Sequence, residues 1–381
     1  MTSDLETQTL GLGEEVPLGE LGKRLKQLWQ SNQALTKASL TNFAIYSERV
    51  DSLAENTALI REVTREHACR ALLIGADPGA AEVRVRVWIT AHCQLTAGGK
   101  KSVCSEQIAF LISGQSPNLV PSTVFAWLES DLPLIFWWQG DFSERWEPHL
   151  FAVIDRLVVD SGEWKDPLGQ FRVLEQSWRG DHGGFTVNDL NWTRLLPLRM
   201  ALAAALDEPG ALAHLAEVEQ IEIDYGPGHQ LAAKMMAAWM IHQAGWALEP
   251  GGGNGERFVV RQQGRAMQLV FRAGAAGAVL PRVELLGPAG MIRLSQEAGS
   301  RYIHARVGLS GGIVDRLTPC PYETPAELVT ERLRRGCHTP RYFELLRTVR
   351  ALLGEGPSYR ATAGLDLRAW GAQAWGHEEW P

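Results

Sequence analysis

The chain has 381 residues, of which 45% are hydrophobic and 21% charged, and its formal net charge at pH 7 is −7. This length is typical of about two to three domains, and we expect two, each with its own core. The composition is that of a folded protein, so disorder is expected only locally. The negative charge gives no general attraction to nucleic acid or to an anionic membrane, and neither is expected as a partner.

Hydropathy and cysteine content favour a cytoplasmic protein. Residues 1–19 form a polar leader without an apolar core of signal-peptide length. No apolar run approaches the roughly 18 residues needed to span a bilayer, since Leu195–Leu206 is interrupted by Arg199. The five cysteines show no CxxC pair and no zinc-type spacing, so we expect no metal site and mostly buried thiols.

Residues 20–185 are predicted to form a Rossmann-like α/β domain with a mostly parallel sheet. The apolar run from Asp131 to Gly140, DLPLIFWWQG, is typical of a buried central strand, across which Trp137 and Trp138 point to opposite faces. The alternation of strands and helices predicts parallel pairing. Further strands are expected over Leu40–Ser47, Cys69–Gly75, Val83–Leu95, Ser102–Ile112 and Arg156–Asp160, and helices over Leu21–Asn32, Asp51–Arg65, Val120–Glu129 and Ser143–Ile154.

An antiparallel hairpin is predicted within this domain. Apolar and polar residues alternate from Val83 to Leu95, and Gly98-Gly99 is a favoured two-residue turn, which places Cys93 opposite Cys104. Cross-strand partners lie near the separation that a disulfide needs, but counting from the turn makes this a hydrogen-bonded pair, the wider geometry. Cys93 and Cys104 are therefore a candidate redox pair, with two packed thiols as the alternative.

Residues 186–353 are predicted to form a second, α+β domain with an antiparallel sheet. Residues 186–206 are expected to supply a polar linker, Thr186–Leu190, and a linking helix, Trp192–Leu206. The later elements are a strand at Glu219–Tyr225, a helix at His229–Gly245, strands at Phe258–Gln262, Ala266–Phe271, Val279–Leu286, Met291–Leu294, Arg301–Val307 and Ile313–Leu317, and helices at Pro325–Gly336 and Pro340–Leu353. For the tail, 354–381, disorder and docking through its tryptophans both stay open.

Catalytic motifs are missing from both domains. No predicted strand leads into a glycine-rich phosphate loop, and we expect no catalytic residue and no cofactor. Asp141 and Asp160 lie near strand ends, where α/β folds place ligand-binding groups, although solvated loop ends explain them as well.

Four other groups of residues are candidate sites. Glu106 falls on the apolar side of the hairpin and must be paired, by an arginine or by a ligand, whereas His92 on the opposite face is a structural donor or a ligand. Trp192 with Arg194 is a candidate partner contact, because these residue types dominate interface hot spots, and intrachain packing is the alternative. Arg334 and Arg335 belong to a basic cluster that suits an acidic surface or a sugar phosphate, with a solvated helix face as the alternative.

Five segments together give the chain a family resemblance. They are Val87–Cys93 (VWITAHC), Cys104–Ile108 (CSEQI), Asp131–Gly140, Asp155–Ser161 (DRLVVDS) and Asp189–Leu195 (DLNWTRL). In these segments the chain resembles the OpcA family of glucose-6-phosphate dehydrogenase assembly or activating proteins, and the segments occur in the order that they have in that family.

The resemblance implies a non-catalytic allosteric effector that binds glucose-6-phosphate dehydrogenase and favours its active oligomer, supporting the oxidative pentose phosphate pathway. It also implies thioredoxin as a second partner, since redox control is linked to this family in cyanobacteria. Two alternatives stay open: an enzyme or sensor that binds a nucleotide or sugar phosphate in the crevice of the parallel sheet, and a redox relay.

Overall fold

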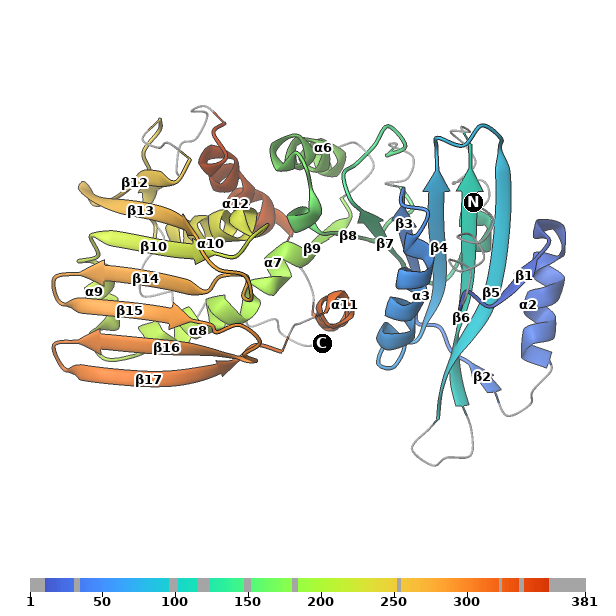
Figure 1. The fold of residues 1–381 in the computed structure, drawn as a ribbon, viewed down its shortest axis with the longest axis horizontal. Coiled ribbons are helices and arrows are strands. Elements are labelled where there is room, and N and C mark those ends of the chain that lie inside the picture. The colour runs from blue at the N-terminus through green and yellow to red at the C-terminus, as the bar shows by residue number, and fades with distance from the viewer. Residues whose placement is uncertain are drawn as a thin grey trace. The chain divides into compact units, whose positions relative to one another are not determined.

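The computed structural model describes residues 11–30, 35–95, 102–114, 124–146, 152–179, 184–251, 255–321, 324–335 and 339–355. The chain divides into two compact units, each with its own sheet (Figure 1). The first unit contains Met1–Asp166, Arg172–Leu190 and Glu323–Cys337; the second contains Pro167–Phe171, Asn191–Tyr322 and His338–Pro381.

Sheet A of the first unit has nine strands within the described ranges, in the order β1-β5-β6-β4-β3-β7-β8-β9, with β2 paired to β6. The strands are β1 (Glu14–Val16), β2 (Leu35–Lys37), β3 (Thr41–Ser47), β4 (Cys69–Asp77), β5 (Arg84–Leu95), β6 (Ser102–Ser113), β7 (Leu134–Gln139), β8 (Arg156–Val159) and β9 (Thr186–Asp189). Neighbours from β6 to β9 run parallel, while β5 pairs antiparallel with β6. The predicted mostly parallel sheet with an antiparallel hairpin is confirmed.

The parallel strands have the order of a Rossmann fold. Leaving out the short β2, the parallel strands in chain order are β3, β4, β6, β7, β8 and β9. Numbered one to six in this way, they lie in the sheet in the order 3-2-1-4-5-6. Strand β3 pairs with β4 on one side and with β7 on the other. Its carboxyl end therefore lies at a topological switch point, the place where open α/β sheets bind ligands.

Helices α3 and α11 of the first unit pack against each other although they are far apart in the sequence. Gly75 on β4 allows α3 to lie close to the sheet, because a Cβ atom there would be 3.1 Å from the Cγ atom of Leu53. The helices that belong wholly or partly to this unit are α2 (Leu21–Gln30), α3 (Ser52–Val63), α6 (Pro167–Arg179) and α11 (Pro325–Arg334), with single turns η1 (Leu18–Glu20), η2 (Phe125–Trp127) and η3 (Ser161–Glu163).

The structure describes only part of each of two predicted helices. Of Val120–Glu129 it describes residues 124–129: Val124 is helical, the turn η2 follows it, and the Asn42 side chain bonds both the N–H and the C=O of Glu129 and holds this backbone against the sheet. Residues 143–146 form a turn, and the rest of the second predicted helix lies largely outside the described ranges. Helix α6 was not predicted.

The hairpin register is confirmed, and a disulfide joins Cys93 to Cys104. The predicted hydrogen-bonded geometry of this pair is wrong. The Cys104 carbonyl accepts a 3.0 Å hydrogen bond from the Ala38 N–H, so it points away from β5, and the two cysteine Cα atoms are only 4.0 Å apart. The glycine turn itself lies outside the described residues.

The predicted polar linker at Thr186–Leu190 is wrong for its first four residues, which form strand β9. Polar side chains occur there because each has a specific partner: Asn188 accepts a 3.0 Å hydrogen bond from Arg332 of α11, and Asp189 accepts one of 2.7 Å from Ser161. Helix α11, expected with the second domain, accordingly belongs to the first unit.

The second unit contains sheet B, whose eight strands have the order β11-β12-β13-β10-β14-β15-β16-β17. All neighbouring pairs are antiparallel except β10 with β13. The strands are β10 (Gln220–Tyr225), β11 (Ala247–Leu248), β12 (Arg257–Gln262), β13 (Arg265–Ala273), β14 (Arg282–Gly287), β15 (Gly290–Ser295), β16 (Tyr302–Leu309) and β17 (Gly312–Pro319). The predicted antiparallel sheet of a second α+β domain is thus present.

The predicted linking helix is two helices, with Pro197 in the first turn of the second. The helices here are α7 (Leu190–Arg194), α8 (Leu196–Leu206), α9 (Ala211–Leu215), α10 (Gln230–Gln243) and α12 (Thr339–Leu352). Across the described ranges, no helix combines the length and apolarity needed to cross a membrane. The predictions for the tail fall on 356–381, outside the described residues.

Reduction of the Cys93–Cys104 disulfide should lower the free energy of unfolding by about 2–3 kcal/mol, because it frees a short loop in the unfolded chain. Denaturant titration with and without a thiol reductant measures the difference. The Cys93→Ala/Cys104→Ala variant is the matched control and should not respond to reductant. Equal stability of the oxidised and reduced wild-type chain would contradict the expectation.

Candidate functional site

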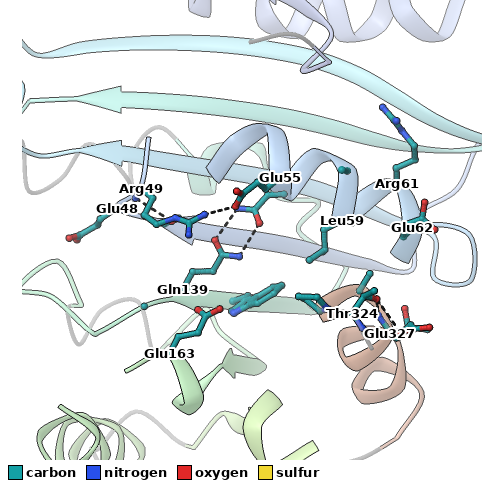
Figure 2. Close-up of a pocket in the computed structure, with 18 of the residues that line it drawn as sticks. Glu48, Arg49, Glu55, Leu59, Arg61, Glu62, Gln139, Glu163, Thr324 and Glu327 are labelled. Atoms are coloured by element: carbon teal, nitrogen blue, oxygen red, sulfur yellow. Dashed lines mark hydrogen bonds and ion pairs between the residues drawn. The ribbon is translucent and has the colours of Figure 1, made fainter. Parts of the chain in front are cut away.

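A crevice of about 1260 Å³ opens in the first unit at the carboxyl ends of β3 and β7, the switch point of sheet A. Its walls come from the β3–α3 connection, from α3, from the end of β7 and from α11, as Figure 2 shows. Glu48 and Arg49 lie in the first of these, Gln139 at the end of β7, and Thr324 and Glu327 at the start of α11. The sequence alone did not place α11 here.

The β3–α3 connection, Ser47-Glu-Arg-Val-Asp-Ser52, contains no glycine. In dinucleotide-binding Rossmann folds this connection is glycine-rich and cradles a pyrophosphate. Here the Glu48 carboxylate occupies the connection, accepting hydrogen bonds from the Tyr46 hydroxyl at 3.0 Å and from Ser143 at 2.5 Å. Burial and the nearby Glu48 raise the pKa of Tyr46, so it remains a donor to this carboxylate.

The inner wall of the crevice carries a buried donor without an acceptor. Trp137 is 2% exposed, and its Nε1–H has no hydrogen-bond partner. Beside it, the side-chain amides of Asn56 and Gln139 bond each other at 3.0 and 2.9 Å. An unsatisfied buried donor destabilises a protein by about 1–3 kcal/mol, so a ligand that supplied an acceptor here would gain from it.

The rim of the crevice consists of exposed ion pairs with an excess of acid. Seven acidic and four basic side chains line the whole crevice. Glu55 pairs with Arg49, Glu62 with Arg65 at 2.5 Å, and Glu66 with Arg334. This excess of negative charge disfavours phosphate groups and favours cationic or uncharged polar groups.

Of the two predicted aspartates, only Asp141 lines the crevice. Its carboxylate accepts the Lys165 N–H at 3.0 Å. Asp160 is buried at the end of β8, where it accepts the Gly162 N–H at 3.1 Å and caps the turn η3.

Glu106 is the centre of a separate buried cluster. It accepts a 2.5 Å hydrogen bond from the Trp29 indole and forms ion pairs with Arg70 at 3.2 Å and Lys37 at 3.6 Å. Glu129 shares both cations, and its hydrogen bond from Lys37 lowers its pKa. The arginine pairing expected for Glu106 is therefore present, and Arg70 is its main partner.

His92 is buried and bonds Gln107 at 2.9 Å, and Gln107 in turn donates to Thr57 of α3 at 3.0 Å. Burial lowers the pKa of His92, which favours the neutral imidazole. The side chain joins the sheet to α3, which fits its interpretation as a structural donor. Among the described residues, no group of three or more His, Cys, Asp or Glu side chains is placed to hold a metal ion.

The predicted partner-contact residues belong to different units. Trp192 lies on α7 of the second unit, where the Arg199 guanidinium stacks over its ring at 3.5 Å. In the first unit, Arg334 pairs with Glu66 and Arg335 with Glu331. Arg194 lies in the last turn of α7, the same helix as Trp192.

Two sequence-family profiles match the chain. One, described as the N-terminal domain of a glucose-6-phosphate dehydrogenase subunit, matches residues 60–176, and its C-terminal counterpart matches 185–346. Both are profiles of OpcA domains, and they follow each other without overlap. The chain belongs to the OpcA family.

Curated OpcA relatives come from cyanobacteria and are named as proteins of the OxPP cycle. That of Synechococcus elongatus is 28% identical over 232 residues, 58% of this chain and 48% of the relative. That of Nostoc punctiforme is 25% identical over 188 residues, 49% of this chain and 40% of the relative. The chain thus matches less than half the length of either relative.

Solved structures that match this chain include a super-repressor mutant of Gal80p from Saccharomyces cerevisiae, with a TM-score of 0.45, 8% identity, and coverage of 88% of this chain and 99% of that one. Another is the aldose–aldose oxidoreductase of Caulobacter crescentus, with a TM-score of 0.42, 12% identity, and coverage of 82% and 96%.

Glu106→Ala should lower the free energy of unfolding by about 3 kcal/mol, because it removes the buried carboxylate that pairs with Arg70 and leaves this arginine to the partly exposed Glu129. Glu129→Ala is the matched control, since this carboxylate contacts the same arginine but is partly exposed, and its cost should be smaller. The double variant Arg70→Met/Glu106→Leu should recover much of the loss. Chemical denaturation measures the free energy of unfolding of all three variants. An equal loss of stability in the two alanine variants would contradict the assignment of Glu106 as the centre of the cluster.

Proposed function

We propose that this chain binds glucose-6-phosphate dehydrogenase and, without catalysis of its own, favours the active oligomer of that enzyme. The observation that carries the proposal is the match of both units to profiles described as domains of a glucose-6-phosphate dehydrogenase subunit. The same role would support the oxidative pentose phosphate pathway, in line with the names of the cyanobacterial relatives.

The chemistry of the crevice is compatible with a binding protein. Glu55 and Glu62 form ion pairs, Glu327 completes the cap of α11, and Glu48, which accepts hydrogen bonds from a tyrosine and a serine, stands where a phosphate-binding glycine loop would be. A nucleotide enzyme on this fold relies on that loop. Binding to another protein needs no such feature.

The effector role requires only a difference in affinity. A protein that binds the active oligomer of the dehydrogenase more tightly than its other forms shifts the equilibrium toward that oligomer. The shift cannot exceed the ratio of the two affinities, so a tenfold change in population needs about 1.4 kcal/mol of differential binding. An interface of ordinary size can supply this difference.

Trp192, Arg194, Arg334 and Arg335 stay proposed contacts for the dehydrogenase. The arginines at the end of α11 are more than half exposed. Arg334 pairs with the exposed Glu66, and a surface ion pair of this kind is worth about 0–1 kcal/mol and exchanges easily for a partner's carboxylate, whereas Arg335 pairs with the buried Glu331. Thioredoxin stays a proposed second partner. Cys93 is the exposed end of the disulfide, where a thiolate could attack, whereas Cys104 is buried.

Adding the purified chain to the dehydrogenase of its own host should raise the enzyme's velocity at subsaturating substrate, along a saturable curve. The reason is that bound effector removes the inactive form from the equilibrium. Initial rates over a range of chain concentrations measure the effect, with heat-denatured chain as the control. A velocity that stays constant at every concentration would refute the proposal.

A second candidate function, a sensor for a nucleotide or sugar phosphate, is favoured by the unpaired Trp137 Nε1–H in a crevice at the switch point. The acidic lining and the missing glycine loop weigh against it.

Calorimetric titration with NADP⁺ and with glucose 6-phosphate separates the two functions. We expect no saturable binding up to about 1 mM, which corresponds to about −4 kcal/mol. Saturable binding that Trp137→Phe weakens would instead establish the sensor, because this change removes the indole donor and keeps an aromatic ring.

A further inference from the structure

Strand β17 forms an outer edge of sheet B (Figure 1). In the part of the chain that the structure describes, it pairs with β16 on one side and with no strand on the other. Seven of its eight residues are exposed, which sets it apart from the inner strands. An unpaired edge of this length is a template for adding another strand.

One hydrogen bond shows which backbone groups of β17 point outward, away from β16. The Cys320 N–H donates to the Arg301 carbonyl at 2.7 Å, so this pair is hydrogen-bonded across β16 and β17. Hydrogen-bonded and non-hydrogen-bonded pairs alternate along antiparallel strands. The N–H and C=O groups of Ile313, Asp315 and Leu317 therefore point away from β16, toward the free edge.

The same three residues give the edge an apolar character. Ile313 and Leu317 are 68% and 67% exposed, and they lie on one face of the sheet with Asp315 between them. Asp315 pairs with Arg306 at 2.7 Å and with His304 at 3.0 Å, so an added strand would meet one acidic side chain between two apolar ones.

A hollow of about 480 Å³ lies beside these side chains. Tyr302, which is 53% exposed, lines it together with His304 and Leu317. A side chain from an added strand has room here, next to the backbone groups that would hold the strand. Backbone bonding for affinity and a pocket for specificity are the two parts of strand-addition recognition.

We propose that the free edge of β17 binds an extended segment of glucose-6-phosphate dehydrogenase as an additional strand, with apolar residues at alternate positions against Ile313 and Leu317. The inference rests on the proposed function and adds the surface and the kind of segment. The segment pairs through the outward N–H and C=O groups and covers an exposed apolar edge.

A second copy of this chain fits the edge poorly. If two copies paired through this edge, a twofold axis would relate them and the two β17 strands would run antiparallel, with the same face of each sheet on the same side. In every such register, one residue lies directly opposite the same residue of the other copy. The two registers centred mid-strand place Asp315 opposite Asp315, or Arg316 opposite Arg316. Like charges directly opposite each other are destabilising, which favours a different chain as the occupant.

Leu317→Pro tests the proposal, because it removes an outward N–H and keeps the N–H groups that bond β16. The dissociation constant for the purified dehydrogenase should rise about tenfold, as expected for losing one hydrogen bond and apolar contact. Leu317→Lys, which keeps the backbone and adds a charge, should act in the same direction. Leu212→Lys is the matched control, since Leu212 is a 49% exposed leucine on α9 of the same unit.

Circular dichroism checks that each variant is folded. If Leu317→Pro unfolds, Leu317→Lys is compared with Leu212→Lys alone. Unchanged affinity of both Leu317 variants would overturn the edge as the binding surface while leaving the proposed function in place. A wild-type chain that does not bind the dehydrogenase at all would overturn both. Wild-type dimers that Leu317→Lys dissociates, with dehydrogenase binding unchanged, would assign the edge to a second copy.

Discussion

The parallel pairing of β3 with both β4 and β7 is the constraint on which the first unit depends. The connection after β3 leads to β4 on one side and the connection after β7 leads to β8 on the other, so an opening forms at the carboxyl ends of β3 and β7. Helix α3 borders the opening on one side, close to β4 through Gly75, and α11 returns from far along the sequence to form another wall. The crevice is thus a consequence of strand order.

The side chains that fill this position change what the fold can do. A Rossmann sheet binds a dinucleotide through a glycine loop and a free helix amino end. Here Glu48 takes the place of the loop and the rim has an excess of carboxylates, so an anionic ligand meets repulsion. A protein that works by binding does not need the crevice for chemistry. Sheet B offers a different kind of surface, an apolar strand edge whose backbone groups pair with no other strand among the described residues.

Local patterns in the sequence predicted the parts of the structure that depend on near neighbours. Alternation from Val83 to Leu95 was enough for the hairpin register and the opposition of Cys93 and Cys104. The same pattern wrongly predicted that Cys93 and Cys104 form a hydrogen-bonded pair, because the Cys104 carbonyl instead accepts the Ala38 N–H, next to β2. The return of α11 left no local signal, since its attachment through Arg332 and Asn188 joins residues 144 positions apart. For the same reason, Thr186–Asp189 resembled a linker.

Sedimentation velocity of the purified chain mixed with glucose-6-phosphate dehydrogenase tests the central claim most directly. The account predicts a new species that contains both proteins, with the dehydrogenase shifted toward its larger, active assembly in proportion to the chain added. Two independent boundaries, each sedimenting as the separate protein does at every mixing ratio, would contradict it.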